Sequence, residues 1–433
     1  MSHAAARLAT IRLVSARHFI LTPVGSSGDV HPYVGLGKML RRRGHDVTIV
    51  SGPTFKNLIE ASGANYLGVG TEQDFDLITH DPDLWHPRRG LKVVLGITAS
   101  MMRQGYDAIA RIYQPGRSVL VGHGIAFHTR VFEDKHHAPA ATLHLAPAVF
   151  RTEHQQPVHL PGRDLSWLPR FMKRGLWWLV DKVFADPHVV PMLNQWRKEL
   201  ALPAVSRVFQ SWMHSPQRVI GLFPDWFGPP QPDWPAQTRL TGFPLFDEAG
   251  HHDPDPALES FLGAGSPPIV FTPGSANRQA DRFFLAGIEA ARQLKRRALL
   301  LTRYPEQLPA KLPDHVLHVS YIPFSQVLHR CAAIAHHGGI GTCAQALAAG
   351  IPQLVMPLGF DQPDNVARLQ RLGVGDFVVP SRFKGKRVAN ALRALLESSD
   401  VKAACEARAL AIRNSHANEQ TCELLESLLP LQR

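Results

Sequence analysis

A strand, a glycine-rich turn, a helix and a second strand follow one another near the start of the chain, and this sequence of elements leaves few folds open to it. The apolar run 18–23 predicts the first strand, and 24–32 predicts the turn that opens the helix. The helix is expected to end at the arginines 41–43 and Gly44, because cations and glycine are favoured at helix C-termini. Residues 46–50 predict the second strand. Such a strand–helix–strand unit is typical of a parallel sheet.

The same pattern returns in the second half of the chain. Residues 268–272 and 298–302 predict strands on either side of a turn at 273–276 and a helix at 281–297. A further strand, helix and strand are expected at 332–336, 342–349 and 353–357, with a glycine-rich turn before the helix. We therefore predict an α/β protein with two doubly wound, Rossmann-like domains in tandem.

The length of 433 residues fits two domains, at about 100–200 residues each. A stretch rich in proline and then in polar residues, 227–255, marks the boundary between them. We expect an N-terminal domain at 1–242, a linker at 243–265 and a C-terminal domain at 266–433. The segment 388–429 predicts one or two helices, the last of which can cross back to the first domain.

Charge and cysteine content narrow the possible functions. Lys and Arg number 47 against 36 Asp and Glu, a net charge of +11 that suits an anionic ligand or surface. The four cysteines form no Cys-x-x-Cys pair, which argues against a disulfide framework or zinc module and favours a reducing compartment. Apolar runs are shorter than the ~20 residues that span a bilayer, and 1–18 lacks the core of a signal peptide. We expect a cytoplasmic protein, with peripheral contact at the inner membrane face as a further option.

Several nucleotide-binding motifs are missing. The turn at 25–28 lacks the G-x-G-x-x-G spacing, and 50–52 lacks the acid that a dinucleotide fold places after its second strand. There is no G-x-x-x-x-G-K-S/T loop, which argues against a P-loop ATPase or kinase. The basic stretches 41–43 and 292–297 have no groove-reading or aromatic motif beside them. We therefore expect neither NAD nor FAD, and no nucleic acid partner.

The strongest local signal is the run 335–342, Ala-His-His-Gly-Gly-Ile-Gly-Thr, between a predicted strand and a predicted helix. Glycines there let backbone N–H groups approach an anion, and the helix N-terminus adds about half a positive charge. His337 can donate a hydrogen bond to a phosphate oxygen. The alternative is a tight turn with a pair of surface histidines.

The residues that follow this turn carry a family resemblance. Residues 337–357 and the run Asp361-Gln-Pro-Asp-Asn365 resemble the donor signature of family-1 glycosyltransferases with the GT-B fold. The turn at 25–32 resembles their N-terminal acceptor loop, in the Gly-Asp form of sterol and glycopeptide glycosyltransferases. Other stretches look similar to the rhamnosyltransferase chains of bacterial rhamnolipid synthesis, at 81–85, 212–216, 222–226 and 241–246. The resemblance covers nearly the whole chain and implies an acceptor-binding first domain and a nucleotide-sugar-binding second domain.

The resemblance also implies how the second domain holds the diphosphate of the donor. His337 would donate to the β-phosphate, beside the backbone of Gly339 and the N–H groups of Gly341 and Thr342. Ser275 lies in the matching turn after the domain's first strand, where the family places a second phosphate donor.

The sugar and nucleoside would be held further along the same domain. Asp361 and Gln362 would bind sugar hydroxyls, although a solvated loop pair is the alternative. Tyr321 would stack on the base and the backbone of Ile322 would pair with its edge, unless Tyr321 is a core residue. Gln345 stands where enzymes that use uridine diphosphate sugars usually have Glu, so the charge-assisted bond to the ribose is lost. This difference favours a dTDP-linked donor over a UDP-linked one.

In the acceptor loop the resemblance implies that Asp29 is the catalytic base, next to Gly28. His31 is a second candidate for the base. Asp29 can instead be the N-cap of a helix that starts one to three residues later, or serve both purposes. His123, which follows a predicted strand, can orient Asp29 or tune its pKa.

Residues 167–184 are apolar and aromatic, with basic residues between them. This stretch can line a lipid-sized pocket, rest on an anionic membrane surface, or form a helical hairpin that packs on the first domain. We expect most side chains of this stretch to pack within such a hairpin and against the first domain.

Together these observations predict an inverting, metal-independent glycosyltransferase. It would move a hexose, with dTDP-L-rhamnose favoured, to a hydroxyl of a hydrophobic or lipid acceptor such as a hydroxyalkanoate. No metal site and no cofactor besides the nucleotide sugar are expected. One alternative is a UDP-glucose-dependent glucosyltransferase of a sterol, macrolide or other small aglycone. Another is a nucleotide-sugar-binding protein or epimerase without transfer activity.

Overall fold

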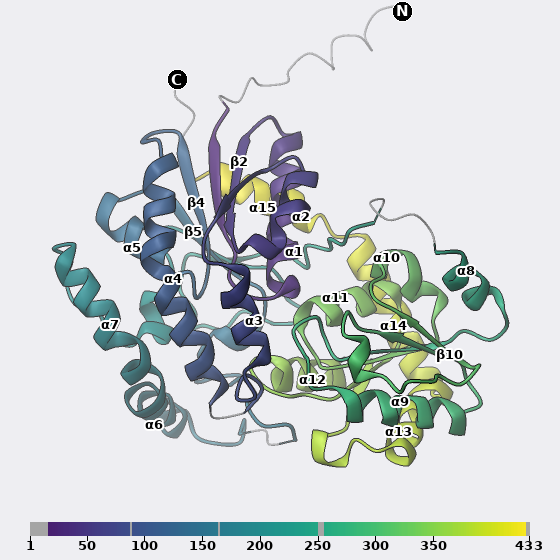
Figure 1. Ribbon diagram of the computed structural model, residues 1–433. Helices are drawn as coiled ribbons and strands as arrows, with labels where there is room; N and C mark the ends of the chain where they lie inside the picture. The colour runs from purple at the N-terminus through teal and green to yellow at the C-terminus, as the bar shows by residue number, and fades with distance from the viewer. Residues whose placement is uncertain (1–15, 87–88, 163–164, 250–254, 430–433) are drawn as a thin grey trace, which may run out of the picture.

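Two parallel β-sheets organise the computed structural model (Figure 1), and the structure describes residues 16–86, 89–162, 165–249 and 255–429. The first sheet contains, in spatial order, β3 (Asn65–Gly68), β2 (Asp46–Ser51), β1 (His18–Thr22), β4 (Ser118–His123), β5 (Ala140–His144), β6 (Val219–Gly221) and β7 (Thr238–Leu240). The second contains β10 (Val316–Val319), β9 (Ala298–Leu301), β8 (Ile269–Thr272), β11 (Ala333–His336), β12 (Gln353–Val355) and β13 (Gly375–Phe377).

Both sheets have the Rossmann strand order, because the direction of strand addition reverses between β1 and β4 and again between β8 and β11. The central strands are buried along their whole length, as expected for strands covered by helices on both faces. This confirms the predicted α/β fold. We call the first sheet with its helices the N-terminal lobe and the second sheet with its helices the C-terminal lobe.

Helices cover both sheets. Those of the N-terminal lobe are α1 (Ser27–Arg42), α2 (Lys56–Ala61), α3 (Glu72–His80), α4 (Gly90–Ile112), α5 (Phe127–His136), α6 (Arg170–Val180) and α7 (Asp186–Glu199). Those that follow are α8 (Pro256–Gly263), α9 (Asp281–Gln293), α10 (Phe324–Val327), α11 (Ile340–Ala349), α12 (Gln362–Arg371), α13 (Gly385–Glu397), α14 (Ser399–Arg413) and α15 (Ala417–Glu426). Among the described residues, no helix combines the length and apolar character needed to cross a bilayer.

The C-terminal segment differs from the expectation of one or two helices, because it forms three. Ser398 ends α13 and caps α14, with its side chain accepting a hydrogen bond from the backbone N–H of Val401 at 3.3 Å. The last helix, α15, lies beside α1 (Figure 1) and contributes Cys422 and Leu425 to the core of the N-terminal lobe. The return of the last helix to the first lobe was predicted as an option, and it makes the N-terminal core depend on the end of the chain.

Two further segments differ from expectation. The stretch predicted as a linker, 243–265, contains helix α8, which starts with Asp255 as N-cap and buries Leu258 and Leu262. The predicted helical hairpin at 167–184 is wrong, because α6 continues through a π-helical segment (Asp181–Ala185) into α7 without a turn. The sequence contains no glycine or asparagine at this junction that would favour a reversal of the chain.

The lobes share an apolar cluster. Phe150, Phe223 and Phe243 from the N-terminal side pack in one cluster with Leu347 and Val366 from the C-terminal lobe. Because the interface is apolar and continuous with both cores, it fixes how the carboxyl ends of the two sheets face each other.

Candidate active site

The candidate residues gather where the two strand orders reverse. In open α/β sheets, ligands bind at the carboxyl ends of the strands at such switch points. The acceptor loop follows β1 and His123 ends β4, whereas Ser275 follows β8 and His337 follows β11. The two glycine turns meet where the lobes face each other, a boundary that we call the cleft, since a β-carbon on Gly341 would lie 3.7 Å from the Cα of Gly28. The N-termini of α1 and α11 therefore face each other.

Asp29 occupies the first turn of α1, but it is not the N-cap that the alternative interpretation expected. Ser26 is the N-cap, because the helix begins three residues before Val30. The Asp29 Oδ2 atom accepts hydrogen bonds from the backbone N–H of Ser26 at 2.7 Å and from its hydroxyl at 3.3 Å. Burial raises the pKa of Asp29 to about 6, against the opposing effect of these bonds. This carboxylate is therefore ionised at neutral pH and is a stronger base than an ordinary aspartate.

The ring of Tyr33 lies between His123 and the first turn of α1, which contains Asp29. Tyr33 follows Asp29 by one helical turn and is fully buried, and its hydroxyl has no hydrogen-bond partner among the described residues. The rings of Tyr33 and His123 are edge to face with centroids 6.5 Å apart. The Nδ1 atom of His123 faces the backbone N–H of Ile125 at 3.4 Å, and burial lowers the pKa of His123 to about 4. A neutral His123 thus supports the wall of the site behind Asp29.

His31 points away from Asp29 and toward the segment between the lobes. Its Nε2 atom lies 3.4 Å from Glu248 Oε1, and its ring meets Phe246 edge to face at 6.0 Å. In this conformation His31 connects α1 to the chain that leads into the C-terminal lobe, which leaves Asp29 as the acceptor-loop residue placed beside the cleft.

His337 is held by the turn that faces it. A β-carbon on Gly274, whose φ is +92°, would lie 2.6 Å from the His337 ring, so glycine is required there. His336 orders the turn from behind, with its Nδ1 accepting from the Gly338 N–H at 3.1 Å and its Nε2 3.0 Å from Gln353 Oε1. The Nδ1 atom of His337 is buried without a partner among the described residues. Burial lowers the pKa of His337 to about 4, so the ring is a neutral donor.

The N-terminus of α11 supplies backbone donors beside His337. Gly339 is the N-cap and Ile340, Gly341 and Thr342 form the first turn, whose N–H groups have no intrahelical acceptor. Ser275 lies exposed on the turn after β8, which packs on the His337 ring through Gly274. This arrangement can bind a diphosphate through backbone N–H groups, an imidazole and the helix dipole.

Asp361 and Gln362, although adjacent, take different positions. Asp361 Oδ2 accepts from Asn365 Nδ2 at 2.7 Å, and burial, together with the charge of Asp29, raises the pKa of Asp361 to about 7. The two carboxylates therefore influence each other across the cleft. The Gln362 Oε1 atom accepts from the N–H groups of Leu358 at 2.7 Å and Gly359 at 3.1 Å, so its oxygen orders the loop after β12.

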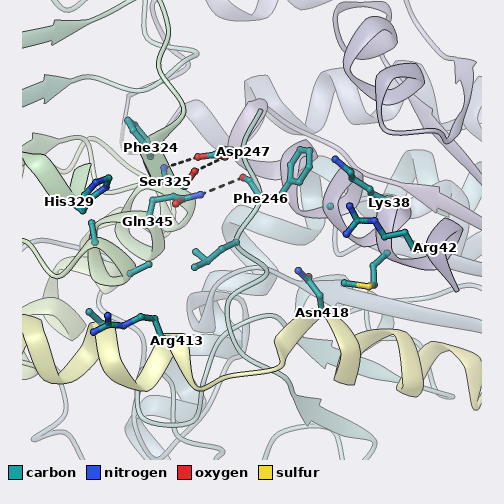
Figure 2. A pocket seen from close by; sticks show the side chains of 16 residues that line it. Lys38, Arg42, Phe246, Asp247, Phe324, Ser325, His329, Gln345, Arg413 and Asn418 are labelled. Carbon is teal, nitrogen blue, oxygen red and sulfur yellow. Dashed lines mark hydrogen bonds between the residues drawn. The ribbon is translucent and has the colours of Figure 1, made fainter. Parts of the chain in front are cut away.

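Of the nucleoside candidates, Gln345 lines a cavity of about 740 Å³ between the lobes, whereas Tyr321 and Ile322 are not among its lining residues. Figure 2 shows Gln345 reaching across it to the backbone oxygen of Phe246, at 3.5 Å. The hydroxyl of Tyr321 accepts from the Glu248 N–H at 3.3 Å, and the Ile322 side chain is buried in the C-terminal core, which leaves its backbone for a ligand. Contact between these residues and 246–248 was not foreseen from the sequence.

Solved structures share this architecture over nearly the full chain. The glycosyltransferase of kitacinnamycin superposes with a TM-score of 0.74 at 19% identity, over 96% of this chain and all of that one. The Streptomyces sp. SF2575 glycosyltransferase SsfS6, complexed with thymidine diphosphate, gives a TM-score of 0.63 at 17% identity, over 95% and 99% of the two chains.

Sequence relatives decide the family. A model described as glycosyltransferase family 28 N-terminal domain matches residues 19–115, and one described as erythromycin biosynthesis protein CIII-like, C-terminal domain, matches 299–427. The chain is 31% identical over 425 residues to O-mycaminosyltylonolide 6-deoxyallosyltransferase of Streptomyces fradiae, covering 94% of this chain and 96% of that protein. The chain belongs to the GT-B glycosyltransferases of family 1. The family resemblance of the two glycine turns is thereby confirmed.

The structure of this glycosyltransferase adds one candidate residue that the sequence did not indicate. Trp85, in the loop after α3, places its ring edge to face with His337 at 6.5 Å and with Phe360 at 5.8 Å. Its indole N–H is buried and has no partner among the described residues. The segment 81–85 resembles part of the rhamnosyltransferase chains, but nothing in its spacing indicated that it reaches the opposite lobe.

Proposed function

We propose that this glycosyltransferase is an inverting, metal-independent enzyme that transfers a hexose from a nucleotide diphosphate sugar to a hydroxyl of a hydrophobic acceptor. The N-terminal lobe binds the acceptor and the C-terminal lobe binds the donor. One observation carries the proposal: the first turn of α1, which holds Asp29, and the first turn of α11, which follows His337, meet where the two lobes face each other.

In the proposed reaction Asp29 takes the proton of the acceptor hydroxyl as the acceptor oxygen bonds to the anomeric carbon. The bond from that carbon to the β-phosphate oxygen breaks, and the nucleoside diphosphate leaves with the electron pair. A single displacement of this kind inverts the anomeric centre. His337 and the N–H groups of Gly341 and Thr342 stabilise the leaving charge, which requires no cofactor besides the nucleotide sugar.

Three side chains are assigned to the sugar and diphosphate in this proposal. Asp361 accepts hydrogen bonds from sugar hydroxyls, and Ser275 adds a donor to the diphosphate. Trp85 donates its indole N–H, which has no partner among the described residues, to the donor beside His337. Gln362 positions the loop that carries Asp361, because its oxygen is engaged by that loop.

We favour dTDP-L-rhamnose as the donor. Gln345 offers the ribose an uncharged partner, a relative is named for transfer of a 6-deoxyhexose, and SsfS6 was solved with thymidine diphosphate.

The proposed acceptor is a lipid such as a hydroxyalkanoate, from the resemblance of 81–85 and 241–246 to rhamnosyltransferase chains. A macrolide acceptor is the second candidate, because the Streptomyces fradiae relative is named for a tylonolide. We place the reaction in the cytoplasm, since all four cysteines are free and buried.

The test combines donors with acceptors. The chain is incubated with dTDP-L-rhamnose or UDP-glucose and with a hydroxyalkanoate, a sterol or a macrolide aglycone, and glycosides are measured by mass spectrometry. We expect a rhamnoside of the hydroxyalkanoate, absent in Asp29→Asn. A glycoside of the macrolide alone would replace the acceptor assignment, and donor hydrolysis without any glycoside would contradict transfer to these acceptors.

A further inference from the structure

Two charged side chains on α6 and the π-helical segment that continues it are buried against the N-terminal lobe. Lys173 and Asp181, eight residues apart and thus on one side of the helix, are only 3% and 2% exposed. The Lys173 ammonium donates to the backbone oxygens of His154 at 3.1 Å and Ser166 at 2.9 Å. Asp181 forms an ion pair with Arg151, whose guanidinium also lies over the Trp177 ring. Lys173 is hydrogen-bonded and Asp181 is ion-paired within the lobe, so the inward side of α6 packs against it.

The opposite side of α6 is apolar and faces outward. Its side chains are 46–75% exposed and define what we call the α6 face: Trp167, Phe171, Met172, Trp178, Leu179 and Val183. With the neighbouring Leu160 and Leu165 they make up eight of the twelve exposed large apolar residues found in the described chain. A surface helix of a globular protein normally buries its apolar side, so this arrangement is the reverse of the usual one.

Cations border the α6 face. Arg170, Arg174 and Lys182 lie on the same helical run, and the Lys182 ammonium sits 4.7 Å from the centre of the Trp178 ring. Arg170 and Arg174 both pair with the Glu153 carboxylate, at 3.8 and 2.9 Å, so one of their two positive charges is offset there. The acid within Arg170–Ala185 is Asp181, which points inward. The outward surface therefore combines exposed aromatic and aliphatic groups with positive charge and carries no exposed carboxylate from the helix itself.

We propose that the α6 face docks this protein onto the surface of a bilayer that contains anionic phospholipids. Tryptophan and phenylalanine insert at the level of the headgroups, while lysine and arginine bind lipid phosphates. The positive border and the net charge of +11 complement an anionic lipid surface, whereas a second copy of this basic chain would bring like charges together. Figure 1 shows α6 at the lower edge of the N-terminal lobe.

Docking would place the bilayer next to the cleft. The chain just before α6 reaches the C-terminal lobe, where the Val158 N–H donates to Asp364 Oδ1 at 3.0 Å, two residues from Gln362. A lipid acceptor would then enter from the membrane side. This last step rests on the proposed lipid acceptor, but docking itself does not depend on the sugar-transfer proposal.

Vesicle co-sedimentation of the full chain tests the proposal. Wild-type protein is mixed with vesicles of phosphatidylcholine alone or with added phosphatidylglycerol. The test variant carries Phe171→Ser, Trp178→Ser and Leu179→Ser together, and the control carries Leu285→Ser and Leu410→Ser, which are 53% and 54% exposed on the C-terminal lobe. We expect the wild type and the control to bind the anionic vesicles and the test variant to bind at least about tenfold more weakly.

A charge variant and a fold control complete the experiment. Lys182→Gln should weaken binding to anionic vesicles about fivefold, and added salt should do the same. Unchanged thermal unfolding of all variants shows that the fold is kept, as expected for exposed side chains. Wild-type protein that stays in solution, or a test variant that binds as well as the control, would overturn docking. So would self-association that the test variant abolishes without any vesicle binding, because the α6 face would then be a dimer surface.

Discussion

In the proposed reaction Asp29 combines two tasks at the start of α1. Its Oδ2 atom closes the first turn by accepting from Ser26, while the other carboxylate oxygen remains for chemistry. An asparagine can keep the capping bond through its amide oxygen but cannot take a proton. The structural and catalytic tasks can therefore be separated by one substitution.

Asp29→Asn should lower kcat by about 100-fold or more while leaving donor affinity nearly unchanged, because a general base typically contributes that much. Steady-state kinetics and calorimetric titration of the nucleotide measure the two effects. Asp74→Asn is the matched control, since Asp74 accepts from the backbone N–H and hydroxyl of Thr71, at 2.7 and 2.8 Å, in the same way at α3. Equal activity of the Asp29 variant and the control would remove Asp29 as the base.

The pH dependence of kcat provides a second test. In the proposed reaction Asp29 works as the carboxylate, and its pKa is about 6, so the rate should be full above this pH and fall as the pH drops through it. The Ser26 hydroxyl lowers the pKa of Asp29, so Ser26→Ala should move the acid limb to higher pH. A limb that stays in place in this variant would point to another group, such as Asp361.

Trp85→Phe removes an indole N–H but keeps a ring against His337 and Phe360. Donor affinity should fall about threefold to tenfold, the size of one lost hydrogen bond. Trp234→Phe is the control, because the Trp234 N–H is likewise buried without a described partner but its ring stacks on Phe150 outside the cleft. A Trp85 variant that binds the nucleotide sugar as well as this control would exclude the assignment.

At the scale of elements, the first turn of α11 can be altered without disturbing its packing. A β-carbon on Gly341 would have only Gly28 within 4 Å, at an ordinary contact distance of 3.7 Å. Gly341→Ala should therefore leave stability unchanged or raise it by up to about 1 kcal/mol. Donor affinity should fall at least tenfold, because the methyl group blocks close approach of the diphosphate to the backbone. Thermal unfolding and calorimetry separate the effects, with Gly96→Ala in α4 as the control; an unchanged affinity would contradict a phosphate site here.

Strands and glycine turns were predictable from the sequence because their signals are local. The buried strands β1, β8 and β11 are short apolar runs that end in glycine turns. This pattern was sufficient to predict both parallel sheets. Helix ends were less predictable where two neighbouring residues could each be the N-cap. Ser26 and Asp29 are both good caps, and only the closed turn shows that Ser26 is the N-cap and Asp29 bonds back to it.

Contacts between distant segments were beyond local signals. Trp85 contacts His337, and Gln345 contacts Phe246, only because of the way in which the two lobes are oriented toward each other. The outward apolar side of α6 has the same helical period as a buried one, so periodicity could not show its direction. The family resemblance indicated the candidate donor residues, whereas the partners that hold these side chains could be found only in the structure.

At the scale of the whole molecule, the chain passes between the lobes at two adjacent places. Thr241, just before the segment that leads into the C-terminal lobe, accepts a hydrogen bond from the Thr421 hydroxyl of α15 at 2.9 Å. At its other end α15 is fixed to α1, where Glu426 binds Arg43 at 2.7 Å and His45 at 2.9 Å. The two crossings therefore lie side by side, and the N-terminal core closes only when the last helix is in place.

Leu425→Ala should destabilise the protein by about 2–5 kcal/mol, because Leu425 is fully buried in the N-terminal core although it lies at the end of the chain. Chemical denaturation measures the free energy of unfolding. Leu410→Ala on α14, an exposed position, is the control and should change it by less than about 0.5 kcal/mol. Equal stability of the two variants would mean that α15 is not part of the core.

The end-to-end meeting of α1 and α11 at Gly28 and Gly341 has an electrostatic consequence. Two partial positive charges of like sign are brought to close range, and their mutual repulsion works against closure of the molecule. Asp29 and Asp361 offset part of it once they ionise, near pH 6 and 7. A diphosphate entering between the helices would act as the missing counter-ion and draw the two halves together, so the substrate itself would complete the electrostatic balance of the fold.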